Sequence, residues 1–154
     1  MANGRYFEDF RIGETFDTEG ITLTEGLIID YGLKYDPQPF HMDIEAAEES
    51  IHGSLVASGF QVMALTFRLF RDTGVISGTN LGGTAADDIH WLKPVRPGDT
   101  IHARVEVIET TPARTRTDRG FVRFRYSTVN QNREVVMTMI LNHVIARHGE
   151  GAGS

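Results

Sequence analysis

The sequence predicts an α+β fold in which an antiparallel β-sheet wraps around one long central α-helix. Residues 59–72 are apolar on nearly all sides, which is typical of a helix buried on nearly all sides. Residues 101–107 and 122–128 alternate between apolar and polar side chains, and residues 135–146 form a longer apolar run. Both patterns are typical of strands. The short links between these strands indicate an antiparallel meander, which supplies the sheet that the helix requires.

Two short helices are expected before the long one. Thr24 is a favourable N-cap for the first, which must end before Pro37 because proline disrupts a helix interior. Asp43 is a favourable N-cap for the second. The long helix begins near Gly59 and ends before Gly74, which is a typical C-terminal stop.

Turn sequences separate the strands. Residues 97–99 (Pro-Gly-Asp) precede the first strand, and residues 130–132 (Asn-Gln-Asn) divide the last two. Gly78, Gly82 and Gly83 indicate a glycine-rich loop, but no Lys-Ser/Thr pair follows, so a nucleotide P-loop is not expected. A buried central helix with an antiparallel sheet curled around it describes a hot-dog fold.

Length and composition limit the classes of function. At 154 residues the chain predicts one domain, which we place at residues 1–148, followed by a flexible tail at residues 149–154. The absence of cysteine excludes disulfides, thiolate catalysis and thiolate metal sites. A net charge of −6 argues against general nucleic-acid binding. No segment resembles a membrane span or a secretion signal, so we expect a cytoplasmic protein that does not enter a membrane.

Asp36 and His41 are the strongest candidates for chemistry. They lie on either side of Pro37 and Pro39. Because proline fixes φ and removes a backbone donor, we expect a short rigid loop here and not a helix. Such a loop lets a carboxylate and an imidazole converge, and this pair is sufficient to hold and activate a water molecule. A purely structural role for Asp36, as the cap of a turn, is the alternative.

No metal site is expected. His41, Asp43 and His52 match no strong zinc signature, and no cysteine is present. His143 falls on a strand pattern and is interpreted as structural.

Four segments follow one another in an order and spacing that resemble a known family. Residues 36–43 read Asp-Pro-Gln-Pro-Phe-His-Met-Asp, residues 53–60 read Gly-Ser-Leu-Val-Ala-Ser-Gly-Phe, and residues 6–13 and 91–99 flank them. The first of these resembles the pattern Asp-x-Asn-Pro-x-His-x-Asp of the MaoC-like dehydratase, or (R)-specific enoyl-CoA hydratase, family. Residues 6–13 resemble its N-terminal segment. Residues 53–60 resemble the start of its central helix, and residues 91–99 resemble its late strand and turn. The resemblance covers about residues 5–146.

The resemblance implies a hot-dog fold, a homodimer as the basic unit and reversible hydration of acyl thioesters without a cofactor. Its catalytic pair corresponds to Asp36 and His41, which would together hold one water and add it syn to a trans-2-enoyl-CoA. Its oxyanion donor corresponds to the backbone N–H of Gly59, at the positive end of the central helix.

The neighbours of these positions are expected to contact the acyl-CoA substrate: Gln38, Phe40, Ser58 and Phe60. Three positions depart from the family pattern. Gln38 replaces an asparagine, Ser58 replaces a histidine, and Phe67 stands near the place of a serine. These changes leave the acid–base pair intact and bear on the fit of the substrate.

Two other functions stay open at this point. A hot-dog acyl-CoA thioesterase would direct the same water at the carbonyl carbon, and a non-catalytic acyl-CoA-binding protein would need no water at all. Gly59 also has a simpler interpretation, as a glycine that a crowded helix start requires. Ser58 has one as well, as an N-cap only.

Overall fold

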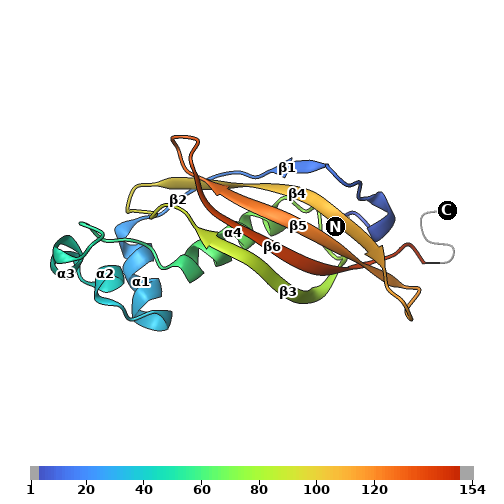
Figure 1. The fold of residues 1–154 in the computed structure, drawn as a ribbon, viewed down its shortest axis with the longest axis horizontal. Coiled ribbons are helices and arrows are strands. Elements are labelled where there is room, and N and C mark those ends of the chain that lie inside the picture. Colours follow the sequence, from blue (N-terminus) through green and yellow to red (C-terminus); the bar gives the residue numbers. More distant parts are fainter. Residues whose placement is uncertain (1–3, 150–154) are drawn as a thin grey trace.

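The computed structural model describes residues 4–149, which form one antiparallel sheet and four α-helices (Figure 1). The sheet has the order β1-β4-β5-β6-β3, with β2 paired to β4. Its strands are β1 Thr15–Asp17, β2 Ile21–Thr22, β3 Asn80–Trp91, β4 Thr100–Pro112, β5 Arg119–Val129 and β6 Val135–Ala146. The helices are η1 Phe7–Asp9, α1 Glu25–Tyr35, α2 Pro39–Met42, α3 Ile44–Glu49 and α4 Gly59–Asp72. The predicted hot-dog architecture is confirmed. The predicted tail beyond Gly149 lies outside the described residues.

The predicted meander is confirmed as β4, β5 and β6. Their pairing is antiparallel throughout, with Val105 opposite Tyr126 and Phe124 opposite Leu141. Apolar side chains that alternate along β5 are completely buried, as the period-two pattern requires. The Phe124 and Tyr126 rings meet the Phe70 ring of α4, so this face of the sheet and the helix share one core.

Strand β3 was not predicted, and the glycine-rich loop expected at Gly82 and Gly83 is wrong because both residues lie within this strand. Three register shifts interrupt its pairing with β6, and Asp88 has a positive φ of 53°. These irregularities interrupt the period-two alternation, so the sequence carries no strand signal here. β3 forms one edge of the sheet.

Helix α4 has the predicted bounds, but the expectation of burial on nearly all sides is wrong. Figure 1 shows α4 running along one face of the sheet. Val62, Thr66 and Phe70 are buried against that face, whereas Phe60 is 59% exposed and Ala64 is exposed. A sheet curled around one side of a helix leaves the other side open in a single chain.

Helices α1, α2 and α3 gather beyond one end of the sheet, beside the start of α4 (Figure 1). The predicted N-caps are confirmed: the Thr24 side chain accepts from the Leu27 N–H, and the Asp43 side chain accepts from the Ala46 N–H. This arrangement brings the end of α1 and the whole of α2 close to the N-terminus of the central helix.

Candidate active site

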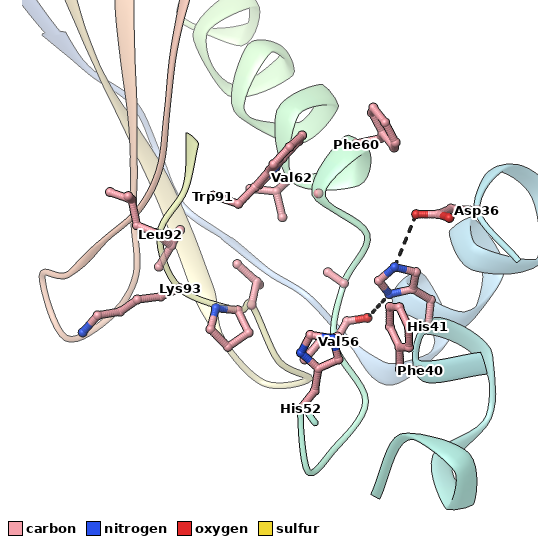
Figure 2. Close-up of a pocket in the computed structure, with 15 residues that line it drawn as sticks. Asp36, Phe40, His41, His52, Val56, Phe60, Val62, Trp91, Leu92 and Lys93 are labelled. Carbon is pink, nitrogen blue, oxygen red and sulfur yellow. Dashed lines mark hydrogen bonds and ion pairs between the residues drawn. The ribbon is translucent and has the colours of Figure 1, made fainter. Parts of the chain in front are cut away.

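Asp36 and His41 lie together at the junction of α1 and α2. Asp36 is the C-cap of α1, and His41 lies on α2. The His41 Nε2 atom is 3.3 Å from Asp36 Oδ2, and the two side chains are only 8% and 18% exposed. Figure 2 shows both groups at one wall of a cavity. A carboxylate and an imidazole therefore face each other, both largely buried, at the edge of this cavity.

The expected loop between these residues is in fact partly helical. Pro39 is the first residue of α2, where a missing N–H costs nothing and the fixed φ suits a helix. The Gln38 N–H donates to the Asp36 carbonyl at 2.7 Å, and the His41 N–H donates to the Gln38 carbonyl at 2.9 Å. The prediction that no helix carries His41 is wrong, because it treated Pro39 as a helix breaker and not as a helix start.

The orientation of the His41 ring is set by a backbone carbonyl. His41 Nδ1 is 2.6 Å from the Val56 carbonyl oxygen (Figure 2). A carbonyl only accepts, so Nδ1 carries a proton and donates it. In neutral His41 the Nε2 lone pair then points toward the Asp36 carboxylate. Two acceptors that face one another can share a water molecule, which donates one hydrogen to each.

Ser58 holds the other member of the pair. Its Oγ donates to Asp36 Oδ2 at 2.7 Å and accepts from the Phe60 N–H at 3.3 Å. The side chain is 1% exposed. Ser58 is thus the N-cap of α4, as one interpretation of the sequence had it, and it also ties the carboxylate to the start of the central helix.

Gly59 is the first residue of α4 and lines the same cavity. The N–H groups at the start of a helix have no intrahelical partner. The Gly59 N–H also has no hydrogen bond to any other group among residues 4–149. It is therefore a free donor at the positive end of the helix dipole.

The cavity has a volume of about 440 Å³ and a mainly apolar lining. Phe40 and Phe60, two of the residues expected to contact substrate, line it, whereas Gln38 is exposed and lies outside the lining. Phe67 is also outside it, stacked on His143 with ring centroids 5.6 Å apart. The apolar wall is completed by Val56, Ala57, Val62, Trp91, Leu92, Pro94, Val95 and Val136.

The remaining polar side chains of the lining are His52 and Lys93. The His52 ring contacts Phe40, with centroids 4.8 Å apart, and Lys93 forms an ion pair with Glu134. Among residues 4–149, no group of three or more His, Asp or Glu side chains is arranged to hold a metal ion. In the same part of the chain, no helix is long and apolar enough to cross a membrane.

Two contributors to this site were not identified from the sequence. Val56 acts through its backbone carbonyl, which every residue has, so the sequence cannot identify it. Trp91 lies in the segment that resembles the family, but nothing in the sequence places it at this cavity. The sequence feature that could have identified it is that it is the chain's single tryptophan, next to the Leu-Lys-Pro-Val run of residues 92–95.

The fold and the site together define a class of protein. The family profile described as "MaoC like domain" matches residues 8–142, so the chain belongs to the MaoC-like dehydratase family. The chain is 30% identical to YdeM of Bacillus subtilis over 140 residues, 91% of this chain and 98% of YdeM. It is 27% identical to an (R)-specific enoyl-CoA hydratase of Rhodospirillum rubrum over 124 residues, 78% of each chain.

A solved structure supports the same assignment. The MaoC-like dehydratase from Rhodospirillum rubrum superposes on this chain with a TM-score of 0.85 at 34% identity. The match covers 95% of this chain and 99% of that structure. The two chains therefore share their entire fold.

Proposed function

We propose that this protein is an acyl-thioester hydratase, or dehydratase in the reverse direction, that adds water syn to a trans-2-enoyl-CoA. One observation carries the proposal: the Asp36–His41 pair and the free N–H of Gly59 border a single apolar cavity. The pair supplies a place for water, the N–H supplies a place for a thioester oxygen, and the apolar wall supplies a place for an acyl chain. The enoyl-CoA hydratase relative supports the same reaction.

The proposed reaction uses the dyad and the oxyanion donor at Gly59. Asp36 and His41 hold one water, and the carboxylate of Asp36 takes one of its protons as the oxygen bonds to C3. The C2–C3 π electrons move toward the thioester carbonyl, and the Gly59 N–H stabilises the oxygen that becomes negative. The dyad then returns the same proton to C2, on the face from which the water came. Atoms and charge balance, and the addition is syn.

The substrate that fits best has an uncharged acyl group. Except for the dyad, His52, Lys93 and the indole N–H of Trp91, the side-chain groups of the lining are apolar, and Lys93 is already paired with Glu134. A second carboxylate on the acyl chain would lose its hydration without a dedicated partner, which is costly. We therefore place uncharged enoyl groups ahead of carboxylated ones.

Incubation with crotonyl-CoA tests the function and its alternatives. Loss of the enoyl absorbance with no free thiol is the expected result. Release of free CoA without loss of the double bond would identify a thioesterase instead. Tight binding of acyl-CoA without turnover of any thioester would identify a non-catalytic binding protein.

We further propose that the working unit is a homodimer joined along β3. An edge strand presents unpaired backbone groups, and proteins usually cover or pair such an edge. β3 is long, and its exposed apolar side chains include Leu81 and Trp91, at 52% and 50% exposure. The open side of α4 would be covered by the same contact.

A further inference from the structure

Trp91 lies directly against Gly59. A Cβ atom built on Gly59 would fall 2.5 Å from Trp91 Nε1, 2.5 Å from Cε2 and 3.0 Å from Cζ2. Both of the nearest atoms belong to the nitrogen-containing ring of the indole. The side of Trp91 that contacts Gly59 is therefore the side that carries the indole N–H.

This contact places two N–H donors close together. The backbone nitrogen of Gly59 is two covalent bonds, at most about 3 Å, from the position of that Cβ atom. Adding the 2.5 Å to Nε1 puts the two nitrogens within roughly 5.5 Å of one another. One oxygen that accepts from two donors at about 3 Å each can bridge nitrogens up to about 6 Å apart. This separation allows a single oxygen atom to lie within hydrogen-bond distance of both nitrogens.

Neither donor is used by the protein itself. Among residues 4–149, the Trp91 indole N–H and the Gly59 backbone N–H have no hydrogen-bond acceptor. Both residues line the cavity that contains the dyad. Trp91 stands at the end of β3, opposite the dyad across the cavity (Figure 2). An indole N–H only donates, so a group that binds it must be an acceptor such as a carbonyl or enolate oxygen.

We propose that the indole N–H of Trp91 is a second oxyanion donor, which acts with the N–H of Gly59 on the thioester oxygen. The assignment rests on the proposed hydratase function. Negative charge grows on that oxygen as water adds to C3 and falls again as C2 takes its proton. Two fixed donors therefore bind the enolate more tightly than the ground-state carbonyl, which is the condition for raising kcat.

An isosteric replacement isolates the N–H. Trp91 is the only tryptophan of the chain, so biosynthetic incorporation of 3-benzothienylalanine in place of tryptophan changes this position alone. In that residue a sulfur atom replaces the indole N–H and the ring shape is kept. We expect kcat on crotonyl-CoA to fall about 10²-fold, the loss typical for one oxyanion donor, with an unchanged melting temperature. Trp91→Phe should lose at least as much. A sulfur form with the native kcat would overturn the assignment.

A second measurement separates this assignment from the hydratase function. Butyryl-CoA is saturated and cannot be hydrated, but its labelled carbonyl reports hydrogen bonding through its infrared frequency. We expect a lower carbonyl frequency in the native protein than in the sulfur form, with comparable affinity by calorimetry. A shifted carbonyl in a protein that hydrates no enoyl-CoA would show that Trp91 donates to the thioester oxygen but would reject the hydratase function. Equal frequencies, or no binding of butyryl-CoA by the native protein, would reject the Trp91 assignment.

Discussion

Ser58 donates a 2.7 Å hydrogen bond to Oδ2 of Asp36, the same carboxylate oxygen that lies 3.3 Å from His41 Nε2. One oxygen is therefore held from the start of α4 and faces the imidazole of α2. We therefore propose that Ser58 is a positioning residue: it holds the carboxylate of Asp36, and the proposed reaction takes no proton from its hydroxyl.

Ser58→Ala should lower kcat/KM about 10-fold or more. A hydrogen bond to a charged group contributes about 1.5–3 kcal/mol, and 1.4 kcal/mol corresponds to a factor of ten. Ser58→Thr keeps the hydroxyl and the helix cap, so it should retain most of the activity. Steady-state kinetics on both variants, with melting curves, checks this. An inactive, well-folded Ser58→Thr together with an active Ser58→Ala would contradict the positioning role.

The dyad should show losses that do not add. Asp36 and His41 are proposed to share one water, so either change alone disables the same step. Asp36→Asn and His41→Ala should each lower kcat at least about 10²-fold, and the double variant should be little worse than either. The measurement is kcat for the four proteins on crotonyl-CoA. Near-normal turnover by Asp36→Asn would remove the carboxylate from the mechanism.

Gly59→Ala should destabilise the protein, and the reason is Trp91. Without the structure, alanine at a helix start looks harmless, since it favours a helix by up to about 1 kcal/mol over glycine. The added Cβ would instead meet the indole at 2.5 Å. The packing of Trp91 supports the interpretation of Gly59 as a sterically required glycine, which is compatible with the proposed role of its N–H.

A double variant tests this steric explanation. If the ring causes the loss, Gly59→Ala combined with Trp91→Ala should be more stable than the two separate losses predict. Thermal melts of the single and double variants give this coupling. Simple additivity of the two losses would show that the methyl group disturbs something other than Trp91.

The edge of the sheet predicts the state of assembly. We expect a homodimer paired along β3, which light scattering should report as about twice the 17.2 kDa of one chain. Leu81→Glu, on β3, should weaken the dimer by placing a charge in the interface. Ile12→Glu, at a residue that is even more exposed but outside β3, is the matched control and should not. A 17.2 kDa monomer that is fully active would refute the dimer as the working unit.

The features that were predicted correctly from the sequence are those that depend on residues close together in the chain. Thr24 and Asp43 cap their helices because a side-chain oxygen two or three residues before a free N–H is a local arrangement. Apolar and polar residues alternate along β4 and β5 because one face of each strand is buried, and this alternation predicted both strands. Strand β3 was missed because glycines and register shifts erase its period, and only pairing with β6 makes it a strand.

The same distinction between local and distant contacts separates the predicted from the unpredicted parts of the site. Asp36 and His41 could be paired in advance because they are near one another in the chain. The contacts of Ser58 with Asp36 and of Trp91 with Gly59 depend on how α1, α4 and β3 pack, which no short pattern encodes. The prolines led to a correct prediction that Asp36 and His41 lie close together. They also led to a wrong prediction of a loop, since Pro39 begins a helix.

His143 should make the protein sensitive to acid. The side chain is buried, with Nε2 at 3.0 Å from the Tyr126 hydroxyl and Nδ1 at 3.3 Å from the Asn80 side-chain oxygen. Burial lowers the pKa of His143 to about 4, and burial also raises the pKa of Tyr126, which therefore stays neutral. Because the pKa is lower in the folded state, the unfolded chain binds more protons between pH 6.5 and about 4.

The contribution of His143 to stability is therefore complete above pH 6.5 and is lost as the pH falls toward 4. The shift corresponds to about 3 kcal/mol over that range. His143→Gln can form similar hydrogen bonds but does not titrate. Urea unfolding at pH 7 and pH 4 should show native protein losing about 3 kcal/mol more than His143→Gln, although the variant starts from a lower stability at pH 7. Equal losses in the two proteins would mean that His143 accepts a proton in the folded state as readily as in the unfolded chain.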